Sequence, residues 1–382
     1  MVMESHFRGP NDLQSVIADG LEQLNQENAA QRIWNGDASF WKADSQTQAA
    51  IHDHLGWLTV ANLMQQRRGE ISGFVDEVRQ AGYQSAVLLG DSSLCAEVLR
   101  LAFGIAPGYL KLFVLDTADP AAIHAVEQQI DLKTTLFIVA SSGKTPETLS
   151  QFRSFYDKVS QAGGTNAGEH FIVITDPGTP SEQLAREHDF RHVFSNPAGI
   201  GGRYSALSYF GLVPAALIGV DIEKLLSRAQ EMMQQCGADH PAQDNPGLWL
   251  GSALGTLATQ RGRNKITFAL SPGIASLGLW LEQLIGGSTG KEGRGLVPIA
   301  SERLGKPEDY GNDRVFVYLR LNGSQNSQLT DAIETLVAAG QPEIHYDLRD
   351  SYDLGAQFFL WEFAVAAAGS FLNINPFDAS NA

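Results

Sequence analysis

The sequence is poor in cysteine, in positive charge and in long apolar segments. It has two cysteines in 382 residues, and no Cys-x-x-Cys pair or cysteine–histidine cluster, so a structural zinc site is not expected. Two scattered thiols, in a chain with no apolar leader at its N-terminus, indicate a protein of the reducing cytoplasm. Lys and Arg number 27 against 43 Asp and Glu, and the net charge of −16 excludes a broad nucleic-acid-binding surface. Apolar runs such as residues 212–220 reach only about half of the ~20 residues that a membrane span needs, so no transmembrane helix is expected.

What is present is an ordinary globular composition, with 43% hydrophobic and 18% charged residues, in a chain long enough for two or three domains. Residues 11–28 carry apolar side chains at close to a 3.6-residue period, and residues 46–80 form a second stretch that also reads as helical. No strand is expected here. We therefore expect a helical N-terminal segment over residues 1–82.

Short apolar strands alternate with amphipathic helices after residue 82. This alternation predicts an α/β protein with mainly parallel sheets covered by helices on both faces, a three-layer αβα arrangement. We expect a first α/β domain over residues 83–220, and a helical connection followed by a second α/β domain over residues 221–382. The expected strands are 85–89, 110–115, 135–140, 171–175 and 191–195 in the first domain, and 266–270, 296–299, 315–321 and 343–348 in the second.

Two loops that follow strands of the first domain are rich in hydroxyl groups. In residues 140–148, four hydroxyls, Lys144 and the start of a helix favour phosphate binding, although serine and threonine also cap helices. For residues 90–93, capping and ligand binding are equally open. The loop of residues 140–148 is not a Walker A motif, because that motif needs a glycine five residues before Gly143, where this chain has Ile138. No GxGxxG dinucleotide fingerprint follows the early strands either.

Two glycine-rich segments are further candidates for ligand contacts. Residues 196–205 place Arg203 as a fixed cation on a loop before a helix, where the plain alternative is a turn with a surface arginine. Residues 282–295 contain five glycines and two cations between an expected helix, residues 274–284, and an expected strand, and indicate a ligand-facing loop. A flexible surface loop is the alternative.

Four segments together resemble the phosphoglucose isomerase family. They are Ser-Gly-Lys-Thr-Pro-Glu-Thr at 142–148, Gly-Gly-Arg-Tyr-Ser at 201–205, Ser-Thr-Gly-Lys at 288–291 and Leu-Asn-Ile-Asn-Pro-Phe-Asp at 372–378. The resemblance spans about residues 30 to 378. The amino-acid sequence of these segments is most similar to that of the isomerase half of bacterial transaldolase–glucose-6-phosphate isomerase fusions. It implies two SIS (sugar isomerase) α/β domains, a homodimer, hexose 6-phosphate as substrate, and the possibility of a fused transaldolase domain in a longer parent chain.

The resemblance also implies a reaction, with residues to perform it. The family interconverts glucose 6-phosphate and fructose 6-phosphate, a step of glycolysis and gluconeogenesis, without metal or cofactor, and a glutamate moves a proton through a cis-enediol while an arginine stabilises the enediolate. Arg203 matches that arginine, with Gly202 beside it. The positions that match substrate-binding or phosphate-binding residues are Ser92 or Ser93, Ser141, Ser142, Thr145, Thr148, Gln283 and Lys291, with Lys144 where the family usually has a threonine.

The catalytic base is the main departure from the family pattern. Gly287 stands where the family has glutamate, and glycine cannot take a proton. Glu282 and Glu292 lie five residues to either side, and each is a candidate substitute at unsuitable spacing. The ring-opening histidine and lysine have no match either, and His345 is expected on a strand.

Three hypotheses are left open by these departures. The first is glucose-6-phosphate isomerase, weakened by the change at Gly287. The second is a catalytically inactive SIS protein that binds a sugar phosphate or has a regulatory role. The third is an isomerase of another phosphosugar that uses Glu282 or Glu292.

Overall fold

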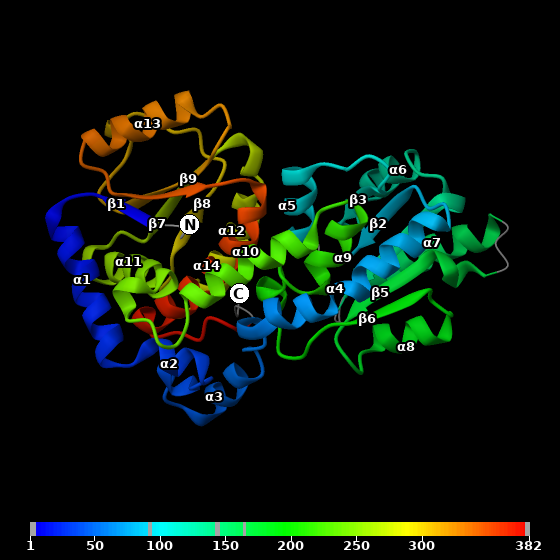
Figure 1. Cartoon of the computed structure of the whole chain (residues 1–382), viewed down its shortest axis with the longest axis horizontal. Helices are drawn as coiled ribbons and strands as arrows, with labels where there is room; N and C mark the ends of the chain where they lie inside the picture. The colour runs from blue at the N-terminus through cyan, green and yellow to red at the C-terminus, as the bar shows by residue number, and fades with distance from the viewer. Residues whose placement is uncertain (1–4, 91–93, 142–145, 163–165, 379–382) are drawn as a thin grey trace. The chain divides into compact units, whose positions relative to one another are not determined.

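The computed structural model describes residues 5–90, 94–141, 146–162 and 166–378, in two compact units (Figure 1). Unit 1 comprises Met1–Leu58 and Lys224–Ala382, and unit 2 comprises Thr59–Glu223. This grouping differs from the expected division at residues 82 and 220, because the first helices belong to the same unit as the C-terminal half. The hydroxyl of Ser252, for example, donates to the backbone carbonyl of Ile17 at 3.0 Å.

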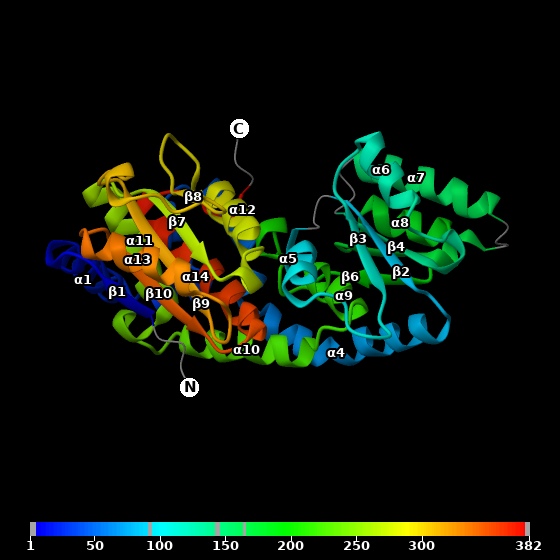
Figure 2. The ribbon, with the colours of Figure 1, turned by 90° about the horizontal axis from the view of Figure 1, so that it is seen from above.

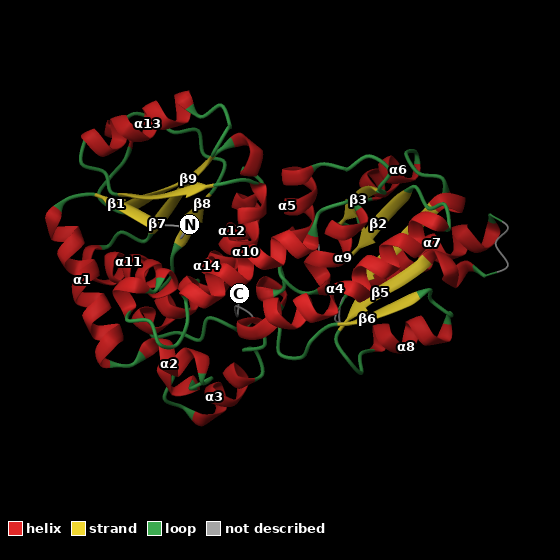
Figure 3. Cartoon of the chain, in the orientation of Figure 1, coloured by secondary structure: helices red, strands yellow, loops and turns green. Residues whose placement is uncertain are grey.

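Unit 2 contains a five-stranded sheet in which every strand is parallel to its neighbours. The strand order is β3-β2-β4-β5-β6, and Figure 3 labels β3, β2, β5 and β6 of this sheet. The strands are β2 (Ser85–Leu89), β3 (Lys111–Leu115), β4 (Thr135–Ala140), β5 (Phe171–Thr175) and β6 (His192–Ser195). The helices are α4 (Trp57–Gln80), α5 (Leu94–Phe103), α6 (Pro120–Glu127), α7 (Pro146–Gln161), α8 (Pro180–Glu187) and α9 (Tyr209–Leu217). The predicted alternation of strands and helices is confirmed.

Helices cover both faces of this sheet, which explains why its strands read as continuous apolar runs. All six residues of β4 are buried. On one face, Phe137 of β4 packs against Phe155 of α7, with ring centroids 4.8 Å apart. On the other face, Phe194 of β6 contacts Phe74 of α4 and Tyr209 of α9.

The sheet of unit 1 has the order β1-β10-β9-β7-β8, in which only β1 is antiparallel to its neighbour. The strands are β1 (Ser5–Arg8), β7 (Lys265–Leu270), β8 (Val297–Ile299), β9 (Arg314–Leu321) and β10 (Glu343–Leu348). The expectation of no strand before residue 82 is therefore wrong. A four-residue strand is too short to show a period, and pairing with β10 and the Arg8–Glu343 ion pair at 2.5 Å hold it in place.

The helices of unit 1 lie on both faces of its sheet (Figure 2). They are α1 (Asn11–Gln26), α2 (Ala29–Trp34), α3 (Ser45–His52), α10 (Ile222–Gln235), α11 (Pro246–Arg261), α12 (Leu277–Thr289), α13 (Ser327–Ala338) and α14 (Leu354–Leu372). Successive residues of β7 face opposite layers: Phe268 meets Trp361 of α14 in an edge-to-face contact, whereas Ala269 joins the apolar cluster that contains Ile333 of α13. The predicted three-layer arrangement is confirmed.

Small residues bring α11 and α14 close together. A Cβ atom added at Gly251 would lie 2.5 Å from the Cβ of Ala367, so the two helix backbones meet there. Residues 351–372, which include α14, are long and apolar enough to cross a membrane by length and composition, but 89% of the most apolar window is buried inside the fold. We read α14 as the core helix of unit 1.

Candidate functional site

The switch point of the unit 2 sheet lies between β2 and β4. The chain passes from β2 to β3 on one side and then returns to β4 on the other, so the loops that follow β2 and β4 leave in opposite directions. Ligands of open parallel sheets bind at such points. The two strand ends approach closely, because a Cβ at Gly90 would lie 2.1 Å from the carbonyl oxygen of Ala140. Gly90 also has a φ of +131°, which only glycine adopts readily.

Two of the predicted phosphate-binding residues are described at this switch point. Ser141 directly follows β4, is buried, and donates its backbone N–H to the carbonyl of Ile174 at 3.2 Å. Thr148, in the first turn of α7, is buried, and a Cβ atom added at Gly90 would lie 3.4 Å from its methyl group. The other predicted residues of these loops lie outside the described ranges: Ser92, Ser93, Ser142, Lys144 and Thr145.

Arg203 sits in a one-turn helix at residues Gly202–Tyr204 that is held by hydroxyl groups of the residues after it. The hydroxyl of Ser205 donates to the carbonyl of Gly202 at 2.6 Å, and the hydroxyl of Ser208 donates to the carbonyl of Ser205 at 2.8 Å. Ser208 also caps α9 by accepting from the N–H of Phe210. Gly202 is exposed, and a Cβ there would meet no atom within 4 Å. The predicted cation is therefore held on a rigid support.

Tyr209, at the start of α9, donates its hydroxyl to the carboxylate of Glu70 on α4. Burial and this carboxylate together raise the pKa of Tyr209 to about 12. Tyr209 is therefore a hydrogen-bond donor rather than an acid at neutral pH. Sequence reasoning missed this pair, because α4 and α9 are far apart in the chain and no local pattern links them.

Gly287 lies in the last turn of α12, which extends to Thr289. The expectation that the helix ends at residue 284 and a loop follows is therefore wrong for residues 285–289, which continue the helix. Gln283 and Gly287 are four residues apart and share one face of α12, whereas Glu282 lies about 140° away from Gly287 around the helix axis. The carboxylate of Glu282 accepts the N–H of Ala300 at 2.8 Å and so ties α12 to the segment after β8.

Residues 291–294 form a tight two-residue hairpin. Lys291 and Arg294 exchange backbone hydrogen bonds of 3.1 and 2.8 Å across it. The central residues Glu292 and Gly293 have φ values of +54° and +70°, the pattern of a type I′ turn. The carboxylate of Glu292 accepts from Lys42 at 2.8 Å. Both carboxylates that flank Gly287 thus have partners of their own.

The hairpin holds the C-terminal Leu-Asn-Ile-Asn-Pro-Phe-Asp motif. The ammonium group of Lys291 donates to the carbonyls of Asn375 and Asp378 and also to the Asp378 carboxylate. The guanidinium of Arg294 donates to the carbonyl of Leu372 at 2.9 Å. Two of the motifs found in the sequence, residues 288–291 and 372–378, are therefore in direct contact. Sequence reasoning missed that Arg294 contributes to this contact.

The structure thus gathers the candidate residues into two sets, each within one unit. Unit 2 holds Ser141, Thr148, Gly202 and Arg203. Unit 1 holds Glu282, Gln283, Gly287 and Lys291. Among the described residues, no group of three or more His, Cys, Asp or Glu side chains is arranged to hold a metal ion.

Comparison with known proteins shows which family has this pattern. A family model described as phosphoglucose isomerase matches residues 67–292. A protein of Methanococcus maripaludis named probable glucose-6-phosphate isomerase is 26% identical over 70% of this chain and 68% of its own length. The glucose-6-phosphate isomerase of Carboxydothermus hydrogenoformans is 31% identical, and that match covers 62% of this chain and 53% of the relative.

Solved structures show the same fold. A hypothetical protein from Thermus thermophilus has a TM-score of 0.78 at 21% identity, over 98% of this chain and 96% of its own. A glucose-6-phosphate isomerase from Chlamydia trachomatis has a TM-score of 0.76 at 19% identity, over 96% of this chain and 83% of its own. At these identities the likeness establishes the fold alone.

Proposed function

Because the chain belongs to the phosphoglucose isomerase family, we propose that it is an aldose–ketose isomerase that interconverts glucose 6-phosphate and fructose 6-phosphate. The observation that carries the proposal is the family match over residues 67–292, which includes Arg203 and the hydroxyl-rich loop after β4. The proposal includes a homodimer, a cytoplasmic location, and a role in glycolysis and gluconeogenesis. A fused transaldolase domain stays a prediction.

In the proposed reaction, the substrate phosphate binds at the switch point of the unit 2 sheet. Ser141 and Thr148, with the predicted residues between them, are the proposed phosphate ligands. A proton then moves between C1 and C2 of the open sugar, and negative charge develops on the enediol oxygens. Arg203 is proposed to stabilise that charge, which a fixed cation does without reorganisation.

The proposed mechanism lacks a general base at the position where the family has glutamate, because Gly287 carries no side chain. Loss of a general base typically slows a reaction by about 10²–10⁴-fold. Neither Glu282 nor Glu292 is a good replacement, because Glu282 is engaged by the Ala300 N–H on another face of α12 and Glu292 by Lys42. We therefore propose slow isomerisation by this chain.

A second candidate function is favoured by the same glycine. A protein that keeps the phosphate loop and Arg203 but lacks the base can bind a sugar phosphate without converting it. In this reading the chain is a catalytically inactive binding or regulatory protein. Both readings require that a sugar phosphate binds, and they differ only in turnover.

The test is conversion of fructose 6-phosphate to glucose 6-phosphate, followed with a coupled dehydrogenase, for the wild type and Gly287→Glu. We expect slow turnover in the wild type and at least a ~10²-fold gain in the variant, because the carboxylate then stands at the base position. Gly286→Glu is the matched control. It adds the same charge one residue earlier, on the Glu282 face of α12, where a Cβ would come no closer than 3.8 Å to Pro298. It should give no gain.

The outcome of the turnover assay distinguishes a slow isomerase from a binding protein without activity. No turnover by the wild type, with some by Gly287→Glu, favours the binding protein. Wild-type turnover at the rate of ordinary isomerases would contradict our reading of Gly287. Binding is tested by titration with 6-phosphogluconate, for which Arg203→Ala should weaken affinity while Arg186→Ala, an exposed arginine paired with Glu182, should not. Equal affinity in all three proteins would contradict the proposed site.

A further inference from the structure

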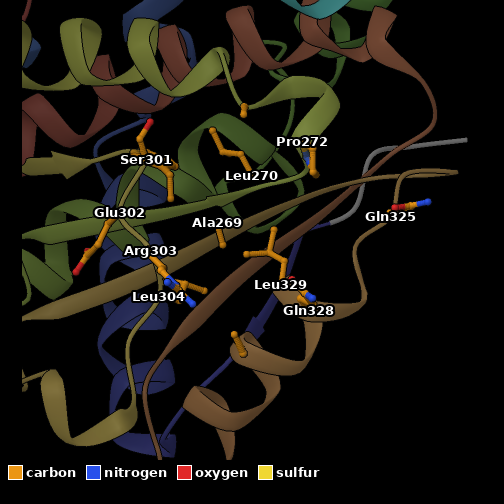
Figure 4. A pocket seen from close by; sticks show the side chains of 13 residues that line it. Ala269, Leu270, Pro272, Ser301, Glu302, Arg303, Leu304, Gln325, Gln328 and Leu329 are labelled. Carbon is orange, nitrogen blue, oxygen red and sulfur yellow. The ribbon is translucent and has the colours of Figure 1, made fainter.

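A cavity of about 530 Å³ opens at the end of β7 in the unit 1 sheet, and no residue of the proposed isomerase site is part of its lining (Figure 4). Its apolar wall includes Leu270, at the end of β7, together with Leu304 and Leu329. Its polar groups include Arg303 and the amides of Gln325 and Gln328. The volume is in the range of sites that bind small molecules. Such sites are usually lined by apolar side chains with a few polar groups among them.

The position of the cavity in the sheet is that of a ligand site. From β7 the chain passes to β8 on one side and then to β9 on the other, so the switch point lies between β7 and β9. Leu270 ends β7, and residues 322–326 connect β9 to the start of α13, where Gln328 and Leu329 enter the cavity wall. Unit 2 has the same connection through β2, β3 and β4. The segment 322–326 thus occupies in unit 1 the place that the predicted phosphate loop occupies in unit 2.

The cavity lining carries one carboxylate, Glu302, and one guanidinium, Arg303. Glu302 is neutralised by Arg314, whose guanidinium lies 2.9 Å from its carboxylate. Arg303 is exposed, and it forms no ion pair with any residue in the described ranges. Figure 4 places Arg303 and Leu304 across the hollow from Gln328 and Leu329. An unpaired guanidinium in an apolar concavity attracts an anion.

The start of α13 adds donors on the opposite wall. The first-turn N–H groups of a helix have no partner within the helix. Asn326 precedes the helix but does not cap it, because its side-chain amide donates to the carbonyl of Leu321 at 3.0 Å. Ser301, also in the wall, has a φ of +61°, an unfavourable conformation for serine that is found more often at ligand sites than elsewhere.

We propose that this cavity binds a small phosphomonoester. The phosphate lies between Arg303 and the first turn of α13, and the carbon skeleton packs on Leu270, Leu304 and Leu329. The amides of Gln325 and Gln328 bind its hydroxyl groups. The chain therefore has a second anion site, in unit 1, that is independent of the sugar-phosphate site proposed in unit 2.

The test is calorimetric titration of the full chain with glycerol 3-phosphate, with inorganic phosphate and with glycerol. We expect saturable binding of glycerol 3-phosphate, weaker binding of phosphate, and none of glycerol. Arg303→Gln should weaken binding of glycerol 3-phosphate about tenfold or more, because a charge-assisted contact to phosphate is lost. Ala332→Phe, which places a ring in the cavity, should abolish it.

Two controls separate this site from its surroundings and from the proposed isomerase site. Lys306→Gln removes the same charge three residues away, outside the cavity wall, and should leave affinity unchanged. Arg203→Ala should weaken any binding in unit 2 while leaving the affinity of the unit 1 site unchanged. Absence of binding by the wild type, or equal affinity of the wild type, Arg303→Gln and Ala332→Phe, would overturn the proposal. Because the readout is binding, the result does not depend on isomerase activity.

Discussion

Lys291 donates hydrogen bonds to the backbone carbonyls of Asn375, at 2.7 Å, and Asp378, at 2.9 Å. Only 10% of its side chain is exposed, so Lys291 itself has little contact with water. Lys291 and Asn375 are 84 residues apart in the chain. A lysine with this set of partners fixes the backbone around Asn375, whatever else it contacts.

Replacement of this lysine by an apolar residue should therefore be costly. Lys291→Met removes two charge-assisted hydrogen bonds to carbonyl oxygens, and we expect the free energy of unfolding to fall by about 2–4 kcal/mol in urea denaturation. Lys265→Met is the control, because the Lys265–Asp313 pair is about 40% exposed and should contribute less than about 1 kcal/mol. Equal losses in the two variants would contradict the structural role of Lys291.

Gly90 is expected to be intolerant of any side chain. In Gly90→Ala, the new Cβ would meet the carbonyl oxygen of Ala140 at 2.1 Å, and the φ of +131° is strained in addition. We expect a loss of more than about 3 kcal/mol in the free energy of unfolding.

Gly82→Ala provides the reference for strain alone. Gly82 has a φ of +85° and no atom within 4 Å of an added Cβ, so its variant should lose only about 1–2 kcal/mol. If Gly90→Ala lost no more unfolding free energy than Gly82→Ala, the close approach of the ends of β2 and β4 would be contradicted.

The fold could be predicted from the sequence because its signals are local. Continuous apolar strands such as β4 and the capped helices between them carry their pattern within a few residues. The strand β1 could not be predicted, since four residues show no reliable period and their pairing with β10 spans more than 330 residues. The end of α12 was misplaced for a different reason: Gly286 and Gly287 suggest a break, but packing of the helix overrides their low propensity.

The candidate site was predictable only in part. Motifs indicated Arg203 and the hydroxyl-rich loops, because those residue types bind phosphate and stabilise anions. Partnerships between distant segments, such as Arg294 with Leu372 or Glu282 with Ala300, leave no trace in a single sequence. These partnerships decide whether a charged residue is available for chemistry.

Glu362 is a carboxyl group in the core of unit 1, on α14. It is fully buried, and neither carboxylate oxygen has a hydrogen-bond partner in the described part of the chain. Burial raises the pKa of Glu362 well above its usual range. Because the pKa of Glu362 is higher in the folded than in the unfolded protein, the protonated side chain favours the folded state below the unfolded pKa of about 4.3. That contribution to stability is lost as the pH rises toward the folded pKa.

The prediction is that removing this acid stabilises the protein at alkaline pH. Glu362→Met should raise the free energy of unfolding by about 1–3 kcal/mol at pH 8, because an unsatisfied buried group is replaced by an apolar one of similar size. The advantage over the wild type should shrink as the pH falls toward 4.5. Glu362→Gln separates ionisation from polarity, since it keeps a polar group but cannot ionise. A wild type that is the most stable of the three at pH 8 would show that Glu362 has a partner or a function.

His345 lies between Glu343 and Asp347 on one face of β10, with its two ring nitrogens each 3.2 Å from a carboxylate oxygen. Burial lowers the pKa of His345, but the hydrogen bonds to the two carboxylates outweigh it, so that the pKa is raised above 6.5. Arg8 and Arg320 also bind these carboxylates, each at 2.5 Å. The protonated histidine is therefore part of a network of alternating charge that joins β1, β10 and β9.

The pH dependence follows from the sign of this shift. Because the folded pKa is higher than the unfolded one, the stabilisation by His345 is complete below about pH 6.5 and is lost as the pH rises through the folded pKa. The difference in unfolding free energy between the wild type and His345→Gln should thus be largest near pH 6 and smallest near pH 9. Asp347→Asn removes one of the two negative charges beside the ring, and an NMR titration of His345 in that variant should give a lower pKa than in the wild type. A stability difference that is constant from pH 6 to pH 9 would mean that His345 is held in the neutral form, and that packing rather than charge keeps it between the two carboxylates.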